Sequence, residues 1–238
     1  MTALLIDGDI VAFKAATVSE HPVQWGEDLW TLHSYTSEAY AYAADMVARL
    51  HENSGCTNAW VFFSGKKNFR KDVDPKYKAN RIGKRKPLCL APLRKRMEET
   101  MRCVSFDGLE ADDLLGIYGS ALPHKTVIWS IDKDLRQIAG LHLIDDEIVE
   151  ISPETAERNF WMQVLVGDTA DNYKGCVGVG PVKAEKILMK NDGLTTWEKV
   201  LAAYEKAGQT FDDALTNARL AFILRKNQRD TLWEPPSQ

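Results

Sequence analysis

Acidic residues occur in four close groups along this sequence, and they are the first residues that could carry out chemistry. Each group alone has a structural explanation, because a carboxylate at a helix start caps amides or is stabilised by the helix dipole. If brought together, neighbouring carboxylates ~4 Å apart repel by roughly 4 kcal/mol at an effective dielectric near 20. The groups are Asp7 with Asp9, Glu110 with Asp112 and Asp113, Asp132 with Asp134, and Asp168 with Asp171.

Apolar runs predict the strands that would bring these groups together. The runs lie at 3–7, 59–63, 103–106, 126–131 and 141–144. Helical patterns alternate with them, so we expect a parallel sheet with helices on both faces. The carboxyl ends of such strands meet at one edge, and the first three acidic groups follow strand ends.

A cluster of eight or nine carboxylates at that edge would require cations. Oxygen ligands without His or Cys favour Mg²⁺, for which Mn²⁺ can substitute. Two such ions about 3.5–4 Å apart are the arrangement that stabilises the attacking and leaving oxygens in phosphoryl transfer. The acidic groups therefore predict a two-metal site.

The charge distribution suggests a polyanionic partner. Residues 65–96 contain thirteen Lys or Arg and two acids, whereas the other residues contain 17 basic and 32 acidic residues, which gives the net charge of −4. A solvated charged loop is one interpretation of this segment. A nucleic-acid-binding arm is the other.

From about residue 153 the sequence predicts helices only, at 154–166, 181–190, 195–207 and 211–226. We therefore expect an α/β catalytic domain over 1–160 and an all-helical DNA-binding region over 161–238. The glycine hairpin 175–180, "GCVGVG", precedes Pro181 and could direct backbone amides at one phosphate. A glycine-rich turn that binds no ligand is the alternative.

Composition excludes several classes of protein. No stretch approaches the roughly 18 apolar residues of a membrane helix, and no signal peptide is recognisable, so we expect a cytoplasmic protein with no membrane partner. The four cysteines are widely spaced and the five histidines form no HExxH motif, which argues against disulfides and a zinc site. The glycine pattern is not a dinucleotide fingerprint, and we expect no organic cofactor.

Together these motifs resemble the 5′-nucleases, the family of flap endonucleases and 5′→3′ exonucleases, and in particular the exonucleases of short-tailed DNA phages. The resemblance spans nearly the whole chain. The matching segments are, in order, "LLIDGD", "NFRKDVDPKYKANR", "EADDLLG", "SIDKDLRQI", "GDTADN" and "GCVGVGPVKAEKIL".

The resemblance implies a PIN-like parallel-sheet nuclease domain followed by a helix–two-turn–helix element. It implies hydrolysis of DNA near 5′ ends at flaps or nicks, during replication or repair, with 5′-phosphate products. Segment 65–96 would be the arch along which a free 5′ end passes, and main-chain carbonyls of the glycine hairpin would bind K⁺.

The resemblance also assigns roles to residues. Asp7, Lys78 and Arg81 would be catalytic, and Tyr77 would stack on a base. Contacts with DNA are expected from Tyr77, Lys78, Arg81, Lys84, Arg85, Lys86, Gly178, Gly180 and Lys183. The metal ligands would be Asp7, Glu110, Asp112, Asp113, Asp132, Asp134, Asp168 and Asp171.

One departure from the family pattern and two rival functions stay open. The family usually has an aspartate at the end of the second strand, where this chain has Ser64 and Gly65. Asp9 could compensate for the missing carboxylate. A phosphatase in which Asp7 is the nucleophile and Asp9 an acid would explain "LLIDGD" alone. A DNA-binding module that lost catalysis is the other alternative.

Overall fold

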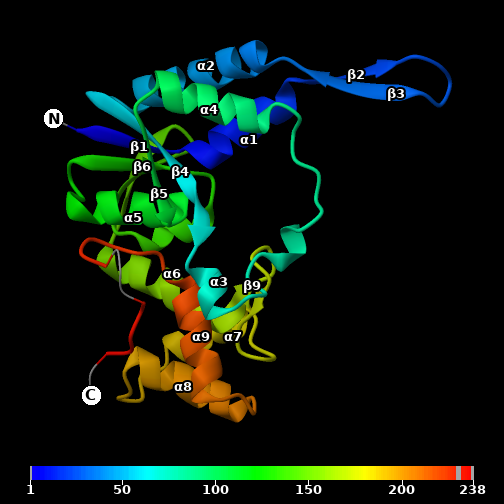
Figure 1. The fold of residues 1–238 in the computed structure, drawn as a ribbon. Coiled ribbons are helices and arrows are strands. Elements are labelled where there is room, and N and C mark those ends of the chain that lie inside the picture. The colour runs from blue at the N-terminus through cyan, green and yellow to red at the C-terminus, as the bar shows by residue number, and fades with distance from the viewer. Residues whose placement is uncertain (1, 229–231, 237–238) are drawn as a thin grey trace.

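The computed structural model describes residues 2–228 and 232–236 and has a six-stranded sheet in its upper part (Figure 1). The strand order is β5-β4-β1-β6-β7-β8, with parallel pairing from β5 to β7 and β8 antiparallel at the edge. The predicted parallel sheet is confirmed, although β8 was not predicted. The strands are β1 (Ala3–Asp7), β4 (Asn58–Asn68), β5 (Cys103–Gly108), β6 (Thr126–Trp129), β7 (Gly140–Ile144) and β8 (Glu147–Ile151).

Helices cover both faces of this sheet, as expected, because strand side chains alternate between the faces. Leu4 and Ile6 of β1 point into the core under α1, α2 and α4. Leu5, between them, points into the core on the opposite face, under α5 and α6. The bounds of these helices are α1 (Gly8–Val18), α2 (Thr36–Ser54), α4 (Leu90–Thr100), α5 (Ala111–Ala121) and α6 (Pro153–Val166).

One helix and one hairpin near the N-terminus were not predicted. Helix α1 follows β1 without a loop, and the Asp7 carboxylate caps it by accepting the Ile10 N–H at 3.2 Å. After α1, the strands β2 (Glu20–Gln24) and β3 (Trp30–Ser34) form an antiparallel hairpin that projects from the body (Figure 1). The helix that we expected at 36–51 is α2.

The C-terminal helical region contains α6, α7 (Pro181–Leu188), α8 (Thr196–Lys206) and α9 (Phe211–Ala221). The expected helices are present, but α9 ends five residues early, and two-residue strands β9 (Gly167–Asp168) and β10 (Tyr173–Lys174) precede the glycine hairpin.

The helical region shares a core with the sheet. The residues of one buried cluster include Ile128 of β6 and Leu114 of α5 together with Trp197 of α8 and Ala218 of α9. The predicted boundary at residue 160 lies inside α6, and Phe160 belongs to this cluster. The catalytic edge and the helical region are therefore packed against each other.

The basic segment, residues 65–96, combines parts of several elements. Its beginning belongs to β4 and α3 (Arg70–Val73), and its end belongs to α4. Between them, residues 74–89 contain one 3₁₀ turn, η1 (Ala79–Arg81), and run along the outside of the molecule from the helical region to α4 (Figure 1).

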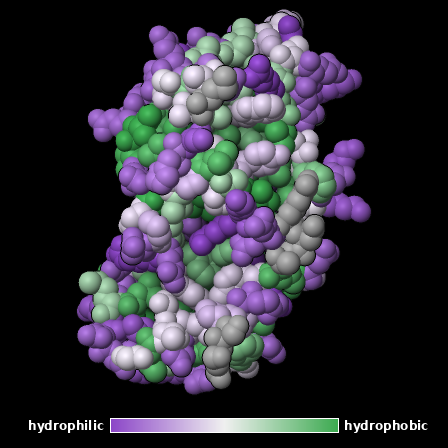
Figure 2. All heavy atoms as spheres, turned by 90° about the vertical axis from the view of Figure 1, so that its left-hand side faces the viewer, coloured by the Kyte–Doolittle hydropathy of each residue, from purple (hydrophilic) through white to green (hydrophobic). Residues whose placement is uncertain are grey.

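No helix in 2–228 or 232–236 is long and apolar enough to cross a bilayer. On the face shown in Figure 2, hydrophobic residues lie in separate patches among hydrophilic ones.

Candidate active site

The sheet topology brings three acidic groups to one edge. Asp7 is the last residue of β1, and β1 lies between β4 and β6. Asp132 follows β6, and Glu110 follows β5 as the N-cap residue of α5. The Ser130 hydroxyl donates to the Asp7 carboxylate at 2.9 Å, which fixes β6 and β1 relative to each other at this edge.

One side of the cluster consists of carboxylates without a basic partner. In the described part of the chain, no Lys, Arg or His forms an ion pair with any of them. We call this set the uncompensated carboxylates: Asp7, Asp112, Asp132, Asp134 and Asp168.

Burial and mutual repulsion raise the pKa values of three of these side chains. Burial raises the pKa of Asp7 to about 7, and the charge of Asp9 adds to this effect. Burial and the charge of Asp132 likewise raise the pKa of Asp134 to about 7. Desolvation, followed by the charges of Asp7 and Asp132, raises the pKa of Asp112 well above its ordinary value. Each raised pKa reflects a negative charge that is poorly solvated and not paired with a cation.

The donor set of the uncompensated carboxylates fits a hard divalent cation, because it offers oxygen ligands only. Asp132 accepts the Asp134 N–H at 2.9 Å, and Asp168 accepts the Ala170 N–H at 2.6 Å. Among residues 2–228 and 232–236, however, no three acidic, His or Cys side chains are already arranged around a common point. Binding an ion would therefore require side-chain rotation toward it.

The other side of the cluster is neutralised by the protein itself, and we call it the compensated carboxylates: Glu110, Asp113 and Asp171. Arg70 pairs with Glu110 at 3.2 Å and with Asp113 at 2.7 Å. The Lys78 ammonium contacts Glu110 and lies 3.4 Å from Asp171. Burial alone would raise the pKa of Glu110, but Arg70 and Lys78 outweigh it and hold that pKa below its ordinary value.

Asp113, which the resemblance predicts as a metal ligand, is paired with a cation of the protein itself. Asp113 is fully buried, and both of its oxygens accept hydrogen bonds from Arg70. The same oxygens accept the N–H groups of Glu110 and Leu224, each at 3.2 Å. Asp113 is thus a buried anchor that caps α5, as the dipole interpretation of a helix start suggested.

Tyr77, for which the resemblance predicts stacking on a base, lies inside the protein. Its ring is 3% exposed and belongs to the core, where it stacks on Tyr173 with 6.4 Å between ring centroids. Its hydroxyl lies 2.9 Å from Glu110 and 2.8 Å from Asp171, so its single proton can be donated to either carboxylate. Tyr77 orients two carboxylates and is inaccessible to a nucleobase.

Lys78 and Arg81 lie where the basic segment meets the loop 167–172. The Arg81 guanidinium contacts the Asp171 carboxylate at 2.5 Å. The Lys78 N–H donates to the Asp171 carbonyl at 2.8 Å, and Lys78 has a left-handed backbone with φ of 56°. The Asn80 side chain donates to the Thr169 carbonyl at 3.0 Å. These contacts hold two cations over the carboxylates.

The other predicted contacts of the basic segment are more exposed. Lys84 and Lys86 are solvent-exposed. Arg85 pairs with Glu20 at the start of β2 through two contacts of 2.6 and 2.8 Å. That pairing ties residues 74–89 to the β2–β3 hairpin.

At the missing aspartate, Ser64 has a structural task. Its hydroxyl accepts the Ala111 N–H at 3.0 Å, which caps α5. Its own N–H donates to Asp9 at 3.1 Å, so Asp9 lies beside the position where the family has a carboxylate. Gly65 leaves no room for a side chain, because a Cβ there would overlap the backbone of Phe106.

The glycines of the hairpin 175–180 differ in their surroundings. Gly175 packs so closely against Gly167 that a Cβ would clash with backbone. Gly178, with φ of 71°, and Gly180 face open space. The Lys183 ammonium donates to the Gly178 carbonyl at 3.1 Å. The first glycine therefore serves packing, whereas the last two are accessible to a large ligand.

Three side chains of the site were missed by sequence reasoning. They are Arg70, which pairs with the compensated carboxylates, Ser130, which donates to Asp7, and Gln163, which donates to Asp134. Arg70 stood among thirteen basic residues of one segment, and nothing in the sequence distinguished a buried arginine from an exposed one.

Comparisons with known proteins find relatives of this sequence. Residues 2–161 match the family model for the 5′-3′ exonuclease, N-terminal resolvase-like domain. An exonuclease of Escherichia phage T7 is 28% identical, with 98% of this chain and 93% of the relative aligned. An exodeoxyribonuclease of Enterobacteria phage T3 is 27% identical over the same shares.

Solved structures share the fold. The flap endonuclease of bacteriophage T5, in a complex with DNA and metal ions, superposes with a TM-score of 0.62 at 15% identity. The superposition covers 93% of this chain and 89% of that one. Because the family model matches about two thirds of the chain and the phage relatives align along nearly all of it, this chain belongs to the 5′-3′ exonuclease family.

Proposed function

We propose that this protein is a metal-dependent 5′→3′ exonuclease and flap endonuclease that hydrolyses DNA phosphodiester bonds near 5′ ends and leaves 5′-phosphates. The observation that carries the proposal is the set of uncompensated carboxylates at the strand ends, directly beside Lys78 and Arg81. A site that holds excess negative charge next to two basic side chains suits an anionic substrate bound through cations.

Two Mg²⁺ ions, or Mn²⁺ in their place, would activate water and stabilise the leaving 3′-oxygen when bound. Asp7, Asp112, Asp132, Asp134 and Asp168 would hold them, together with Glu110 and Asp171 once their cations move. Lys78 and Arg81 would leave these carboxylates and bind the scissile phosphate. There they would balance the negative charge that grows in the transition state. Asp9 would supply the charge that Ser64 lacks.

DNA is the proposed partner, and the duplex would extend from this site toward the helical region. The T5 relative of the same fold is described in a complex with DNA. Lys84, Arg85 and Lys86 would contact phosphates of the strand that carries the 5′ end. Gly178 and Gly180 would let the backbone approach the duplex, with K⁺ competing with Lys183 for the Gly178 carbonyl.

A cleavage map tests this function. We expect cutting of 5′-end-labelled flap, nicked and blunt duplexes in Mg²⁺ and none in EDTA, with 5′-phosphate ends on the products. Hydrolysis of a small phosphomonoester with intact DNA would support the phosphatase alternative. Duplex binding without cleavage in Mg²⁺ or Mn²⁺ would mean that the loss of the family's aspartate at Ser64 has abolished catalysis.

A further inference from the structure

Arg70 is the centre of a buried clamp behind the carboxylates. Its side chain is 3% exposed, and all five of its N–H groups can be assigned to acceptors. Nε donates to the Leu220 carbonyl, Nη1 to Glu110 and Asp113, and Nη2 to Asp113 and the Phe222 carbonyl, at distances between 2.6 and 3.2 Å. The clamp therefore joins α3, the start of α5 and the end of α9.

The clamp determines how Glu110 is oriented. Oε2 of Glu110 accepts from Arg70 at 3.2 Å and from the Tyr77 hydroxyl at 2.9 Å. Oε1, the remaining oxygen, contacts the Lys78 ammonium. Oε2 of Glu110 is thus fixed by Arg70 and Tyr77, and Oε1 points toward Lys78.

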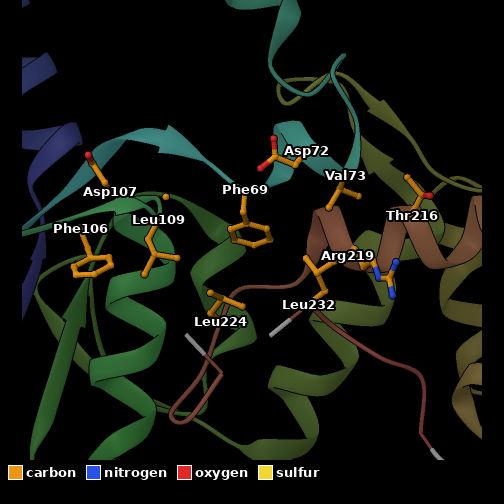
Figure 3. A pocket seen from close by; sticks show the side chains of 11 residues that line it. Phe69, Asp72, Val73, Phe106, Asp107, Leu109, Thr216, Arg219, Leu224 and Leu232 are labelled. Atoms are coloured by element: carbon orange, nitrogen blue, oxygen red, sulfur yellow. The ribbon is translucent and has the colours of Figure 1, made fainter. Parts of the chain in front are cut away.

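The clamp is buried and lies against an aromatic ring. The Arg70 guanidinium lies over the Phe69 ring, 4.7 Å from its centroid. Phe69, Leu109 and Leu224 also line a pocket of about 590 Å³ (Figure 3). Phe69 directly precedes Arg70 in the sequence, and Leu109 directly precedes Glu110. The Leu224 N–H donates to Asp113. In such surroundings a charged hydrogen bond has a strong orienting effect.

We propose that Arg70 is a positioning residue: it holds Glu110 so that Oε1 is presented to a divalent cation, and it makes this orientation depend on the docked end of α9. The proposal rests on the proposed function, because Glu110 must ligate a cation for the orientation to matter. Partners that orient metal ligands from behind typically affect metal affinity 10–100-fold.

The substitution that tests this role must keep the charge. Removing a positive charge next to carboxylates would strengthen cation binding by itself, and would mask a loss of orientation. Arg70→Lys retains the charge, but an ammonium has three donors and cannot reproduce the planar fork that reaches Glu110 while binding both oxygens of Asp113. We therefore expect Arg70→Lys to weaken cation binding although the net charge is unchanged.

Binding of Mn²⁺ to the DNA-free protein, followed by electron paramagnetic resonance, gives a readout independent of catalysis. We expect Arg70→Lys to raise the Mn²⁺ concentration for half-saturation by about tenfold or more. Arg225→Lys is the matched control, because Arg225 is partly buried near Phe222 and donates to the Gln137 carbonyl. Its half-saturation should equal that of the parent protein.

A second background separates orientation from general loosening. If Arg70 acts through Glu110, Arg70→Lys in a Glu110→Gln protein should change Mn²⁺ half-saturation by less than about twofold. An equal weakening in both backgrounds would overturn the proposal. So would a folded Arg70→Lys protein that binds Mn²⁺ like the parent.

Two further results keep this test distinct from other failures. If Arg70→Lys does not fold, Tyr77→Phe is the second test, because it removes the other hydrogen bond to Oε2 of Glu110. We expect Tyr77→Phe to weaken Mn²⁺ binding. Parent-like binding would overturn the role of Arg70 and Tyr77 in orienting Glu110. If the parent protein itself binds no Mn²⁺ and cuts no DNA, the proposed function fails. Parent-like binding by Arg70→Lys beside a functional parent overturns the Arg70 inference alone.

Discussion

Neighbouring residues of α5 illustrate two environments of a carboxylate. Both carboxylate oxygens of Asp113 accept hydrogen bonds from Arg70. Asp112, one residue earlier, has no cation paired with it among the described residues, and its pKa is strongly raised. Like Asp113, Glu110 and Asp171 are paired with basic side chains. One side of the cluster therefore stabilises the fold, and the other side costs stability in a way that a bound cation can relieve.

The strongest test of this difference is Asp112→Asn. We expect cleavage in Mg²⁺ to fall by about three orders of magnitude or more, because several kcal/mol of transition-state stabilisation are lost with a ligand. In EDTA the variant should melt at the same or a higher temperature, since an unpaired charge is removed. Asp132→Asn should behave alike, and a variant that cuts at the parent rate would remove Asp112 from the metal site.

Asp113→Asn should have the opposite effect on stability. Breaking a buried ion pair typically costs about 3–5 kcal/mol, because the remaining charge of Arg70 is left without its partner. Thermal melting in EDTA, compared with Asp112→Asn, measures this directly. If both variants melted at the parent temperature, the two sides of the cluster would not differ as we propose.

Lys78→Ala tests whether a compensating cation serves the reaction. We expect the single-turnover cleavage rate at saturating enzyme to fall about 10²-fold, the typical effect of removing one charge-stabilising donor, with little change in duplex affinity. Lys84→Ala, in the exposed part of the same segment, should instead weaken binding and leave the saturated rate unchanged. Equal losses of rate and affinity in Lys78→Ala would reduce Lys78 to a phosphate contact.

The uncompensated side also predicts a pH dependence. Asp7 and Asp134 have pKa values of about 7 in the folded protein and an ordinary value of 3.8. Between about pH 4 and 7 the folded protein holds protons that the unfolded chain has released, so stability in EDTA should fall as pH rises through this window. The slope is at most about 1.4 kcal/mol per pH unit and group.

Urea unfolding at pH 5, 6, 7 and 8 measures this slope, and the double variant Asp7→Asn/Asp134→Asn should flatten it. Adding Mg²⁺ should restore stability mainly at the higher pH, where the carboxylates are charged. Stability that rises between pH 5 and 7 in EDTA would contradict an uncompensated pair.

The smallest effect is expected outside the cluster. Gly180→Val should weaken duplex binding by about 1 kcal/mol, or roughly fivefold, because a side chain would stand between backbone and phosphate. Gly180 has an ordinary backbone conformation and an open neighbourhood, so the fold and the Mg²⁺ dependence should not change. Unchanged duplex affinity in a folded variant would make the hairpin purely structural.

Much of the fold followed from local patterns in the sequence. Apolar runs ending in acids, such as residues 3–7, predicted β1, and the alternation of strands and helices predicted the parallel sheet with its acidic edge. The hairpin β2–β3 and the edge strand β8 escaped prediction, because these mostly exposed strands lack the apolar runs that buried strands have. Local periodicity is visible in a sequence because each element must bury one face.

The sequence by itself predicted that several carboxylates would meet at one sheet edge. Only the tertiary structure decided which carboxylate would be neutralised. Asp112 and Asp113 are identical in type and adjacent in sequence, yet Arg70 and the Leu224 amide reach one of them from other parts of the chain. Tyr77 likewise became a buried hydrogen-bond donor through contacts with Asp171, distant in sequence. The charge state and burial of a carboxylate depend on side chains that only folding brings together. The same residue type can therefore be neutralised inside the fold or remain available to bind a cation.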